Sequence, residues 1–294
     1  IEADHESTSM EVKGIGGDLR FQDIAVDCRS SGTTSRFLLP VLVAGTGNVA
    51  IDGSAQLRSR PFNEQIKALR SLGCSLTETR APGELPIEIV AEGVNGARVE
   101  ISGATSSQFI SGLMLAAPLY AGGLTIELTD TIVSRPYLDL TVKVMHDFGA
   151  VVEQPNESTY VIQQGQHRCA DIEIEPDASA ASYFFAAAAI TQGNVKVDGL
   201  HRESCQGDIQ FVDVLEKLGA KVTWGKNSIE VQGDRINGGT FDLQDFSDTA
   251  QTLASVAAFA ESEVEIKGIG FIRVKETDRI AAVVSELTKC GVEV

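Results

Sequence analysis

A segment of about 72 residues recurs four times along the chain, and this repeat constrains the fold more than any other feature. Each copy contains an amphipathic stretch that ends in glycine and leads into a short β-branched segment. The four glycines, Gly73, Gly149, Gly219 and Gly291, are 76, 70 and 72 residues apart. The repeats of solenoid and propeller proteins are usually about 20–50 residues long. The longer period indicates that each copy is a complete supersecondary unit.

The same elements recur upstream of each glycine. A cluster rich in Ser, Thr or Asp is followed by an apolar run, a glycine turn, a strand, a polar loop and the amphipathic run. The clusters, at residues 30–35, 105–108, 177–180 and 245–248, supply typical helix N-caps. The order predicts β-α-β-α-β units with one further strand, hence an α/β protein. The first helical runs, such as residues 184–190, are apolar on nearly all sides, which is typical of helices buried inside a domain.

The polar stretch at residues 163–175 divides the four copies into two pairs. We therefore expect two lobes, residues 1–170 and residues 171–294, with two repeat units in each. The first residue is Ile1, and residues 1–16 have neither a signal-peptide nor a transit-peptide pattern. We expect the chain to begin inside a longer protein.

Charge and hydropathy exclude several classes of partner. The chain has 24 Lys and Arg against 41 Asp and Glu, a net charge of −17, whereas nucleic acids and anionic membranes need a basic face. Its apolar runs are far shorter than the roughly 18 residues of a membrane span. The five cysteines, an odd number without a CxxC pair, favour free thiols in a reducing compartment, so we expect a cytoplasmic protein. Small anions remain compatible, because a site needs only local positive charge.

The sequence lacks the common motifs of cofactor and metal chemistry. Residues 45–50 match the dinucleotide fingerprint as text, but they follow a helical run and precede a strand, the reverse of what cofactor binding requires. No GxxxxGKS or GxxxxGKT phosphate loop and no GxSxG nucleophile motif occurs, and the histidines at positions 5, 146, 167 and 201 lack metal-site spacing. We therefore expect neither a metal nor an organic cofactor.

The repeat instead predicts an anion site. The first helices of repeated α/β units start at one edge, so the free N–H groups and partial positive charge of their N-termini can converge. Ser106, Ser107 and Gln108 would add hydroxyl and amide donors there. Helix capping is the alternative for each single residue, and the four aligned copies weigh against it. Asp248, near the fourth N-terminus, would stay ionised and accept a proton, although capping alone explains it equally well.

The second loop of the units carries basic residues: Arg60, Arg135, and the pair Lys275 and Arg279. Guanidinium groups bind carboxylates and phosphates through paired donors, so arginines at corresponding loops indicate anion recognition. The i,i+4 spacing of Lys275 and Arg279 would present two cations near one face at a helix start, with Glu276 beside them. Solvated surface arginines and an ordinary helical ion-pair run are the alternatives.

At these clusters the sequence resembles the family of 5-enolpyruvylshikimate-3-phosphate (EPSP) synthases, enolpyruvyl transferases of the shikimate pathway. The family's motifs occur in the family's order along nearly the whole chain. They are GTTSR, RP, SSQF, SRPY, DASAASY, QGD, SD and RVKETDR, beginning at positions 32, 60, 106, 134, 177, 206, 247 and 273. Each motif alone is weak, but the ordered set is specific.

The resemblance implies a two-lobed enolpyruvyl transferase fold with three βαβαββ units per lobe. Four of the six units would be present here, without the first unit of the first lobe and the last unit of the second. The implied reaction transfers the enolpyruvyl group of phosphoenolpyruvate to the 5-hydroxyl of shikimate 3-phosphate and releases phosphate, with no cofactor. The partners would be these small anionic substrates, the complete protein would be a monomer, and glyphosate would occupy the phosphoenolpyruvate site.

The resemblance also implies roles for individual residues. Shikimate 3-phosphate would contact Ser106, Ser107, Gln108, Ser134, Tyr137, Asp248 and Lys275. Phosphoenolpyruvate would contact Gly32, Arg60, Gln108 and Arg279, with Gly32 leaving room for the phosphate. Asp248 would deprotonate the attacking hydroxyl, and Lys275 and Glu276 would manage proton transfer, Glu276 to and from the methylene carbon. Adding an alcohol across an enol double bond needs such a base at oxygen and an acid at carbon.

Two residues depart from the family's common pattern: Phe37 stands where Pro or Leu is frequent, and Ser30 where Asn is common. The family's opening phosphate-binding segment would precede Ile1, and its final substrate-binding segments would follow Val294. The alternative is therefore a non-catalytic fragment that folds or binds ligand but needs complementary chain segments for turnover. The sister family that acts on UDP-N-acetylglucosamine is disfavoured, because residues 54–58 lack its reactive loop cysteine.

Overall fold

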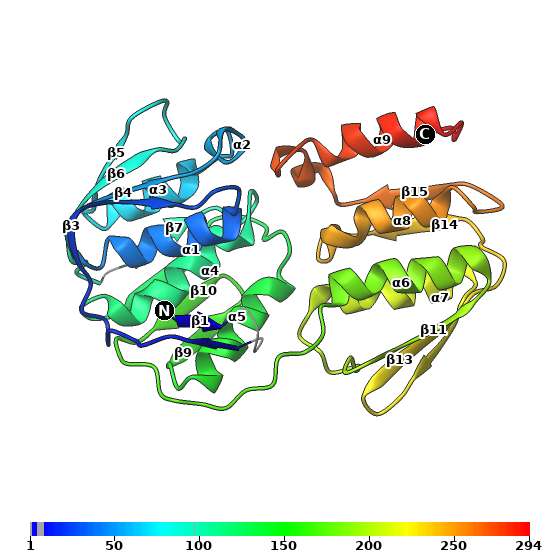
Figure 1. Ribbon diagram of the computed structural model, residues 1–294, viewed down its shortest axis with the longest axis horizontal. Coiled ribbons are helices and arrows are strands. Elements are labelled where there is room, and N and C mark those ends of the chain that lie inside the picture. Colours follow the sequence, from blue (N-terminus) through cyan, green and yellow to red (C-terminus); the bar gives the residue numbers. More distant parts are fainter. Residues whose placement is uncertain (1, 5–8, 97) are drawn as a thin grey trace.

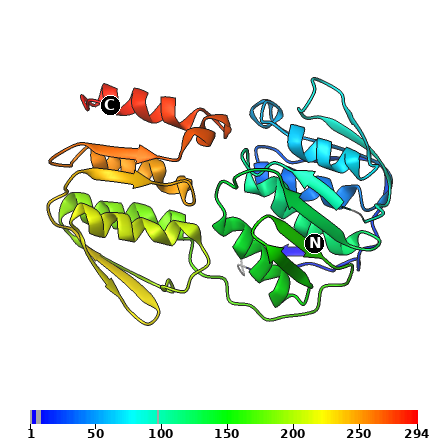
Figure 2. The ribbon, with the colours of Figure 1, turned by 180° about the vertical axis from the view of Figure 1, so that it is seen from behind.

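The computed structural model describes residues 2–4, 9–96 and 98–294; Ile1 and His5 lie outside these ranges. Figure 1 shows two bodies joined by a long loop, an amino-terminal body in blue to green and a carboxy-terminal body in yellow-green to red. The same division is visible from behind (Figure 2). Each body has its own hydrophobic cluster, the first within residues 28–162 and the second within residues 178–272. Helices pack against sheets in both bodies, which confirms the α/β class.

The first repeat unit lies in the amino-terminal body. It consists of β3 (Arg20–Asp27), α1 (Gly32–Leu42), β4 (Thr46–Asp52), α2 (Ala55–Arg58), α3 (Asn63–Ser71), β5 (Ser75–Glu78) and β6 (Ile87–Glu92). The sheet order is β3-β4-β6-β5, with β3 and β4 parallel and the other pairs antiparallel. The parallel pair needs a helical crossover, which α1 provides.

The second unit repeats this topology. It consists of β7 (Arg98–Ile101), α4 (Ser107–Ala116), η1 (Ala117–Leu119), β8 (Leu124–Leu128), α5 (Pro136–Asp147), β9 (Val152–Asn156) and β10 (Thr159–Ile162). The sheet order is β7-β8-β10-β9, with the same strand directions. The expected βαβαββ unit is thus confirmed in two copies. A short antiparallel pair, β1 (Glu2–Asp4) and β2 (Ser9–Glu11), precedes them.

The third and fourth units form the carboxy-terminal body with fewer strands. The third consists of α6 (Ala178–Thr191), β11 (Asn194–Asp198), η2 (Gly207–Gln210), α7 (Phe211–Leu218), β12 (Lys221–Trp224) and β13 (Ser228–Gln232). The fourth consists of β14 (Gly239–Asp242), η3 (Ser247–Thr249), α8 (Ala250–Ala257), β15 (Val264–Lys267), η4 (Gly270–Val274) and α9 (Arg279–Lys289). The sheet orders β11-β13-β12 and β14-β15 are parts of the same pattern.

The strand expected after the fourth repeat glycine is not formed in the described part of the chain, and the end of the polar connecting stretch is not a strand either. Residues 171–175, before α6, and residues 292–294, after α9, are neither strand nor helix. A strand needs a neighbouring strand edge for its backbone hydrogen bonds. Among the described strands β11 pairs with β13 alone and β15 with β14 alone, and Ile174 is 79% exposed. Neither segment is packed into a sheet, so the expectation of a strand at residues 292–294 is wrong, whereas residues 171–175 belong to the polar stretch at residues 163–175.

The glycines that mark the repeat all end helices. Gly73, Gly149, Gly219 and Gly291 have φ angles of 84°, 77°, 119° and 84°, directly after the last turns of α3, α5, α7 and α9. Glycine adopts this left-handed conformation without the steric cost that a side chain brings. The repeat visible in the sequence is therefore largely a recurring helix-termination signal.

The first helices of the units differ in burial. Helix α4 packs between α1 and α5, and its Phe109 and Leu113 are fully buried, as expected. Helix α6 packs against α7, α8 and the β11–β13 sheet, but its Tyr183 and Phe184 are 62% and 61% exposed. No described element covers these two rings. The expectation that residues 184–190 lie entirely inside a core is therefore wrong for this face of α6.

Candidate active site

Hydrogen bonds between the two bodies mark the candidate site. The amide of Ser134 donates to the Gln244 carbonyl at 3.1 Å, and the Gln244 side chain donates to Ile132 at 3.3 Å. Further along the interface, the Gln56 side chain donates to the Glu276 carbonyl at 2.7 Å. These contacts bring η3, η4 and the start of α9 opposite the helix N-termini of the amino-terminal body.

Helix capping is confirmed for three of the four first helices. Ser31, Ser106 and Asp177 each accept a hydrogen bond from a backbone N–H in the first turn of α1, α4 and α6, at 3.1, 3.3 and 3.1 Å. These bonds satisfy N–H groups that have no partner inside the helix. Asp248, by contrast, caps neither η3 nor α8, so the capping alternative for Asp248 is wrong. Its carboxylate faces the other body.

Arg36 on α1 connects the first two units and was not among the expected site residues. Its Nη1 donates to Gln108 Oε1 at 2.8 Å and to Ser106 Oγ at 3.5 Å. The Gln108 amide in turn donates to Thr33 Oγ1 at 3.0 Å. Arg36 therefore orients Ser106 and Gln108, two of the residues expected to bind shikimate 3-phosphate.

The setting of Arg36 explains how a buried cation is tolerated. Its side chain is 2% exposed, and its guanidinium lies 4.8 Å from the ring centroid of Phe109 and 5.6 Å from that of Phe62. Burial, together with the charge of Arg60, lowers the pKa of Arg36 to about 9, so it stays cationic at neutral pH. The sequence signal was an arginine three residues before the buried Leu39 on the apolar side of α1.

Gly32 and Arg60 are in direct contact. A Cβ built on Gly32 would lie 2.3 Å from Arg60 Nη1, so the absence of a side chain leaves room for the guanidinium. The Arg60 Nε is buried and has no hydrogen-bond partner among the described residues. Burial lowers the pKa of Arg60, Glu276 opposes this shift and Arg279 adds to it. Arg60 therefore keeps a guanidinium N–H without a partner, beside other cations that favour an anion.

Lys275 lies in the same electrostatic environment. Burial lowers its pKa, the nearby Asp248 opposes the shift, and the charges of Arg279, Arg36 and Arg60 add to it. Its Nζ lies 5.6 Å from the ring centroid of Phe271. Three arginines thus act on one lysine, which is the pattern of a site built for anions.

The helical arrangement expected for Lys275 and Arg279 is wrong. Asp278 caps α9 through a 3.0 Å hydrogen bond from Ala281 N, so Arg279 is the first helical residue. Lys275 precedes the cap and follows η4, with φ of −78° and ψ of −145°. The two cations approach each other through this turn, not along one helix face.

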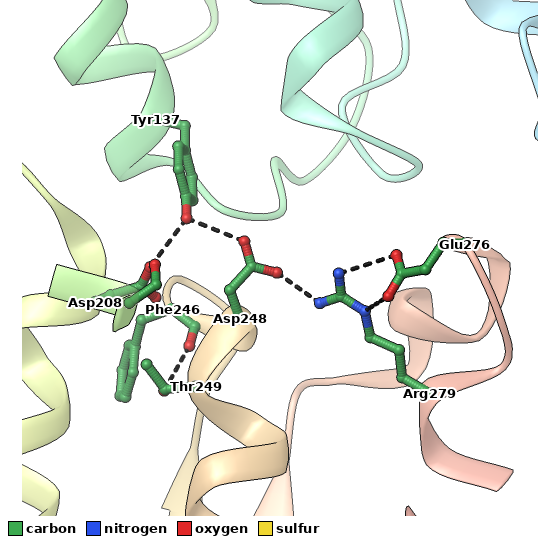
Figure 3. A network of polar contacts seen from close by, with 8 residues as sticks. Tyr137, Asp208, Phe246, Asp248, Thr249, Glu276 and Arg279 are labelled. Carbon is green, nitrogen blue, oxygen red and sulfur yellow. Dashed lines mark hydrogen bonds and ion pairs between the residues drawn. The ribbon is translucent and has the colours of Figure 1, made fainter. Parts of the chain in front are cut away.

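Arg279 holds both expected proton-transfer carboxylates (Figure 3). Its Nη1 donates to Asp248 Oδ1 at 2.6 Å, its Nε to Glu276 Oε1 at 2.7 Å and its Nη2 to Glu276 Oε2 at 3.0 Å. The Arg279 side chain is 17% exposed, against 39% for Asp248 and 43% for Glu276. The bidentate geometry is the strong form of an arginine–carboxylate pair.

These contacts shift the titration of both partners. Burial raises the pKa of the Glu276 carboxyl, but the hydrogen bonds and positive charge of Arg279 outweigh it, and the net pKa lies below the usual range. Burial lowers the pKa of Arg279, and its bonds to Glu276 and Asp248 reverse that shift, so its net pKa is raised. Glu276 is therefore held ionised while the pair persists.

Tyr137 reaches across from α5 to the carboxy-terminal body (Figure 3). Its hydroxyl lies 3.0 Å from Asp208 Oδ2 and 3.2 Å from Asp248 Oδ2. Asp208, on η2, is 4% exposed and also accepts a hydrogen bond from Ser179 at the start of α6. Asp208 was visible in the sequence only within the QGD motif, and no expected role was attached to it.

The remaining candidate residues lie around this network. Ser107 is the first residue of α4 and is buried. Ser134 is buried beside the interface, with a φ of 57° that is uncommon for a residue with a side chain. Arg135 makes its hydrogen bond to the Glu157 carbonyl, in the turn between β9 and β10, and it has no contact with the carboxylates of the network. Of the four loop cations, three gather at the site.

The described residues show neither a metal-binding cluster nor a membrane-spanning helix. No group of three or more His, Cys, Asp or Glu is placed to hold a metal ion, among the residues that the structure describes. Within the same ranges no helix is long and apolar enough to cross a membrane. All five cysteines are free thiols.

A family model described as EPSP synthase (3-phosphoshikimate 1-carboxyvinyltransferase) matches residues 1–294. The chain is 39% identical over 293 residues to the 3-phosphoshikimate 1-carboxyvinyltransferase of Shewanella oneidensis, covering 99% of this chain and 69% of that protein. The relative from Marinomonas is 38% identical over 291 residues, with 98% and 68% covered. Both relatives are named as transferases.

Solved structures agree in fold. EPSP synthase from Acinetobacter baumannii matches with a TM-score of 0.72 at 24% identity, over 90% of this chain and 61% of that chain. The enolpyruvyl transferase NikO from Streptomyces tendae matches with a TM-score of 0.63 at 19% identity, over 79% and 55%. The chain thus spans less than two thirds of the length of these structures. By its family match and its relatives, the chain belongs to the EPSP synthase family, the 3-phosphoshikimate 1-carboxyvinyltransferases.

Proposed function

We propose that the protein transfers the enolpyruvyl group of phosphoenolpyruvate to the 5-hydroxyl of shikimate 3-phosphate and releases phosphate, a step of aromatic amino acid biosynthesis. The observation that carries the proposal is Arg279, which holds Asp248 and Glu276 while it shares its surroundings with Arg60 and Lys275. A base for oxygen, an acid for carbon and positive charge for the leaving phosphate are thus adjacent.

We assign phosphoenolpyruvate to the cationic side of the site. Its phosphate and carboxylate would be held by Gly32, Arg60, Gln108 and Arg279. The support is the contact of Gly32 with the Arg60 guanidinium and the unpartnered, buried Nε of Arg60. An anion placed there would gain paired guanidinium donors and relieve the repulsion among neighbouring cations.

We assign shikimate 3-phosphate to the opposite side. It would contact Ser106, Ser107, Gln108, Ser134, Tyr137, Asp248 and Lys275. The support is that Arg36 ties Ser106 to Gln108 while Tyr137 bonds to Asp248, so residues from both bodies line one place. The N-terminus of α4, where Ser106 and Ser107 lie, favours binding of a phosphate group.

In the proposed reaction Asp248 takes the proton of the attacking hydroxyl as the new carbon–oxygen bond forms. Glu276, released from Arg279 and protonated through Lys275, delivers that proton to the methylene carbon. It later removes a proton from the same carbon as the carbon–oxygen bond to phosphate breaks, and Asp248 returns the proton of the hydroxyl to the leaving phosphate. Arg279 must loosen its hold on both carboxylates for this to occur. The anionic groups of phosphoenolpyruvate compete for the same guanidinium, so substrate binding would free Asp248 and Glu276.

We further propose that the two hydrophobic clusters correspond to two lobes, residues 1–170 and 171–294, and that the protein works as a monomer in the cytoplasm on small anions. The support is the separate cluster in each body, the −17 net charge and the five free thiols. Closure of the lobes on the substrates would exclude water and strengthen the ionic contacts.

A phosphate-release assay tests the proposed function. The complete protein with both substrates should release phosphate, whereas we expect this 294-residue chain alone to release little or none. Omission of either substrate, or replacement of shikimate 3-phosphate by UDP-N-acetylglucosamine, should abolish release. Isothermal titration with each substrate runs in parallel. Binding without turnover would support the alternative of a non-catalytic fragment that needs complementary segments. Neither binding nor turnover would overturn the proposed function.

A further inference from the structure

The hydroxyl of Tyr137 lies between two carboxyl groups of the other body (Figure 3). The distances from its oxygen to Asp208 Oδ2 and Asp248 Oδ2 are 3.0 and 3.2 Å, both within hydrogen-bond range. A phenol carries a single hydrogen, and an ionised carboxylate can only accept. With both acids ionised, one of these contacts would set a lone pair against a lone pair. Two full hydrogen bonds at these distances need one further proton in the Asp208–Tyr137–Asp248 triad.

The surroundings show which carboxyl holds that proton. Asp248 is 39% exposed and has Arg279 bonded to Oδ1 at 2.6 Å, so its negative charge is compensated. Asp208 is 4% exposed, and its Oδ1 is buried without a hydrogen-bond partner. A buried carboxylate without a cationic partner is costly, and the neutral acid costs much less.

The groups that face Asp208 agree with this assignment. Tyr137 approaches from α5, Ser179 and Asp177 from the start of α6, and Asp248 from η3. Burial raises the pKa of Asp208, the charges of Asp248 and Asp177 add to the shift, and the hydrogen bonds from Ser179 and Tyr137 oppose it. The two charged neighbours that act on Asp208 are both acidic.

We propose that Asp208 is a neutral positioning residue: its proton is donated to the Tyr137 oxygen, so that the Tyr137 hydrogen points at Asp248 and holds that carboxylate in place. The inference rests on the proposed function, in which Asp248 accepts the proton of the attacking hydroxyl. The triad fixes one oxygen of Asp248 from the amino-terminal body, while Arg279 fixes the other from α9. Asp248 is thereby oriented before substrate arrives.

The protonation is tested without any turnover. In protein labelled with 13C at the aspartate side-chain carboxyls, the Asp208 resonance is the one absent from Asp208→Asn, or absent from Asp208→Glu if the Asn variant does not fold. We expect the chemical shift of a protonated acid at neutral pH and titration only as the pH rises further. The shift of an ionised carboxylate at neutral pH would overturn the proposal.

Kinetics test the positioning role. An Asn amide donates to Tyr137 as the protonated acid does, so Asp208→Asn should keep kcat within about threefold of the parent, whereas Asp208→Ala should lose about tenfold or more with a smaller change in KM. In a Tyr137→Phe background Asp208→Ala should lower kcat by less than about twofold, because Asp208 acts on Asp248 only through the Tyr137 hydroxyl. Asp234→Asn, at an exposed position, is the charge control.

If Asp208→Asn and Asp208→Ala reduced kcat equally, the inference would be overturned. It would also be overturned if Asp208→Ala reduced kcat as much in the Tyr137→Phe background as in the parent. A parent protein that binds neither substrate and releases no phosphate would instead overturn the proposed function. The resonance of Asp208 would still decide the protonation in that case.

Discussion

Arg36 and Arg279 act on the same small region from different bodies, yet they are held in different ways. Arg36 is 2% exposed, lies against two aromatic rings and donates to neutral side chains. Arg279 is 17% exposed and is held by two carboxylates that the proposed chemistry needs. Packing therefore holds the first cation permanently, whereas the second is held by groups that a substrate can displace.

The two bodies contribute differently to the site. The amino-terminal body presents a rigid surface, since Arg36 fixes Ser106 and Gln108 through side-chain bonds within one core. The carboxy-terminal body presents charged groups that neutralise one another at rest. Substrate would find donors in place on one side and would have to exchange ion pairs on the other.

Removing a carboxylate that Arg279 holds in the carboxy-terminal body should have the largest effect on turnover. Glu276→Gln keeps the shape of the side chain but cannot exchange a proton at the methylene carbon. We expect kcat to fall by roughly 10² or more, with a smaller change in substrate binding. Phosphate release gives kcat, and titration calorimetry gives binding. An unchanged kcat would remove Glu276 from the mechanism.

Truncating the two arginines should separate packing from ion pairing. Arg36→Ala removes a buried side chain from the faces of Phe109 and Phe62, so we expect about 2 kcal/mol less free energy of unfolding. Arg279→Ala removes a partly exposed ion pair and should cost less than about 1 kcal/mol. Urea unfolding at constant m-value measures both. Equal losses would refute the contrast drawn between the two arginines.

Gly32→Ala, which adds a methyl group in the amino-terminal body, should have a smaller effect, and that effect should be on substrate binding. The added Cβ would lie 2.3 Å from Arg60 Nη1, so the guanidinium must move away. We expect KM for phosphoenolpyruvate to rise about tenfold, or about 1.4 kcal/mol, and inhibition by glyphosate to weaken as well. Gly165→Ala, where a Cβ meets nothing within 4 Å, is the matched control. Unaltered affinity for both ligands would show that Gly32 does not line their site.

The smallest effect concerns pH. The folded-state pKa of Glu276 is lowered below its unfolded value, so its pair with Arg279 stabilises the fold above the unfolded pKa. This stabilisation is lost as the pH falls through the folded pKa. Because Glu276 is 43% exposed, we expect Glu276→Gln to reduce the free energy of unfolding by less than about 1 kcal/mol at neutral pH, and not at all in acid. A pH-independent difference would contradict the ion-pair account.

Local rules made much of the fold readable from the sequence. The glycines after α3, α5, α7 and α9 indicate the positive φ angles at which these helices end. The starts of three helices are indicated by their N-cap residues Ser31, Ser106 and Asp177. The unformed strand at residues 292–294 shows the limit of such rules, because a strand exists only when another strand pairs with it. Propensity is local, but pairing is not.

The sequence by itself determined the repeat, the α/β units, the helix ends and the family motifs, because each is written in residues close together along the chain. Only the tertiary structure decided that Arg36 is buried, that Arg279 joins Asp248 to Glu276, and that Tyr137 meets Asp208. Tyr137 and Asp208 lie in different bodies, 71 positions apart. Packing of the bodies brings such residues together, and it sets the burial and charge that decide which group keeps its proton.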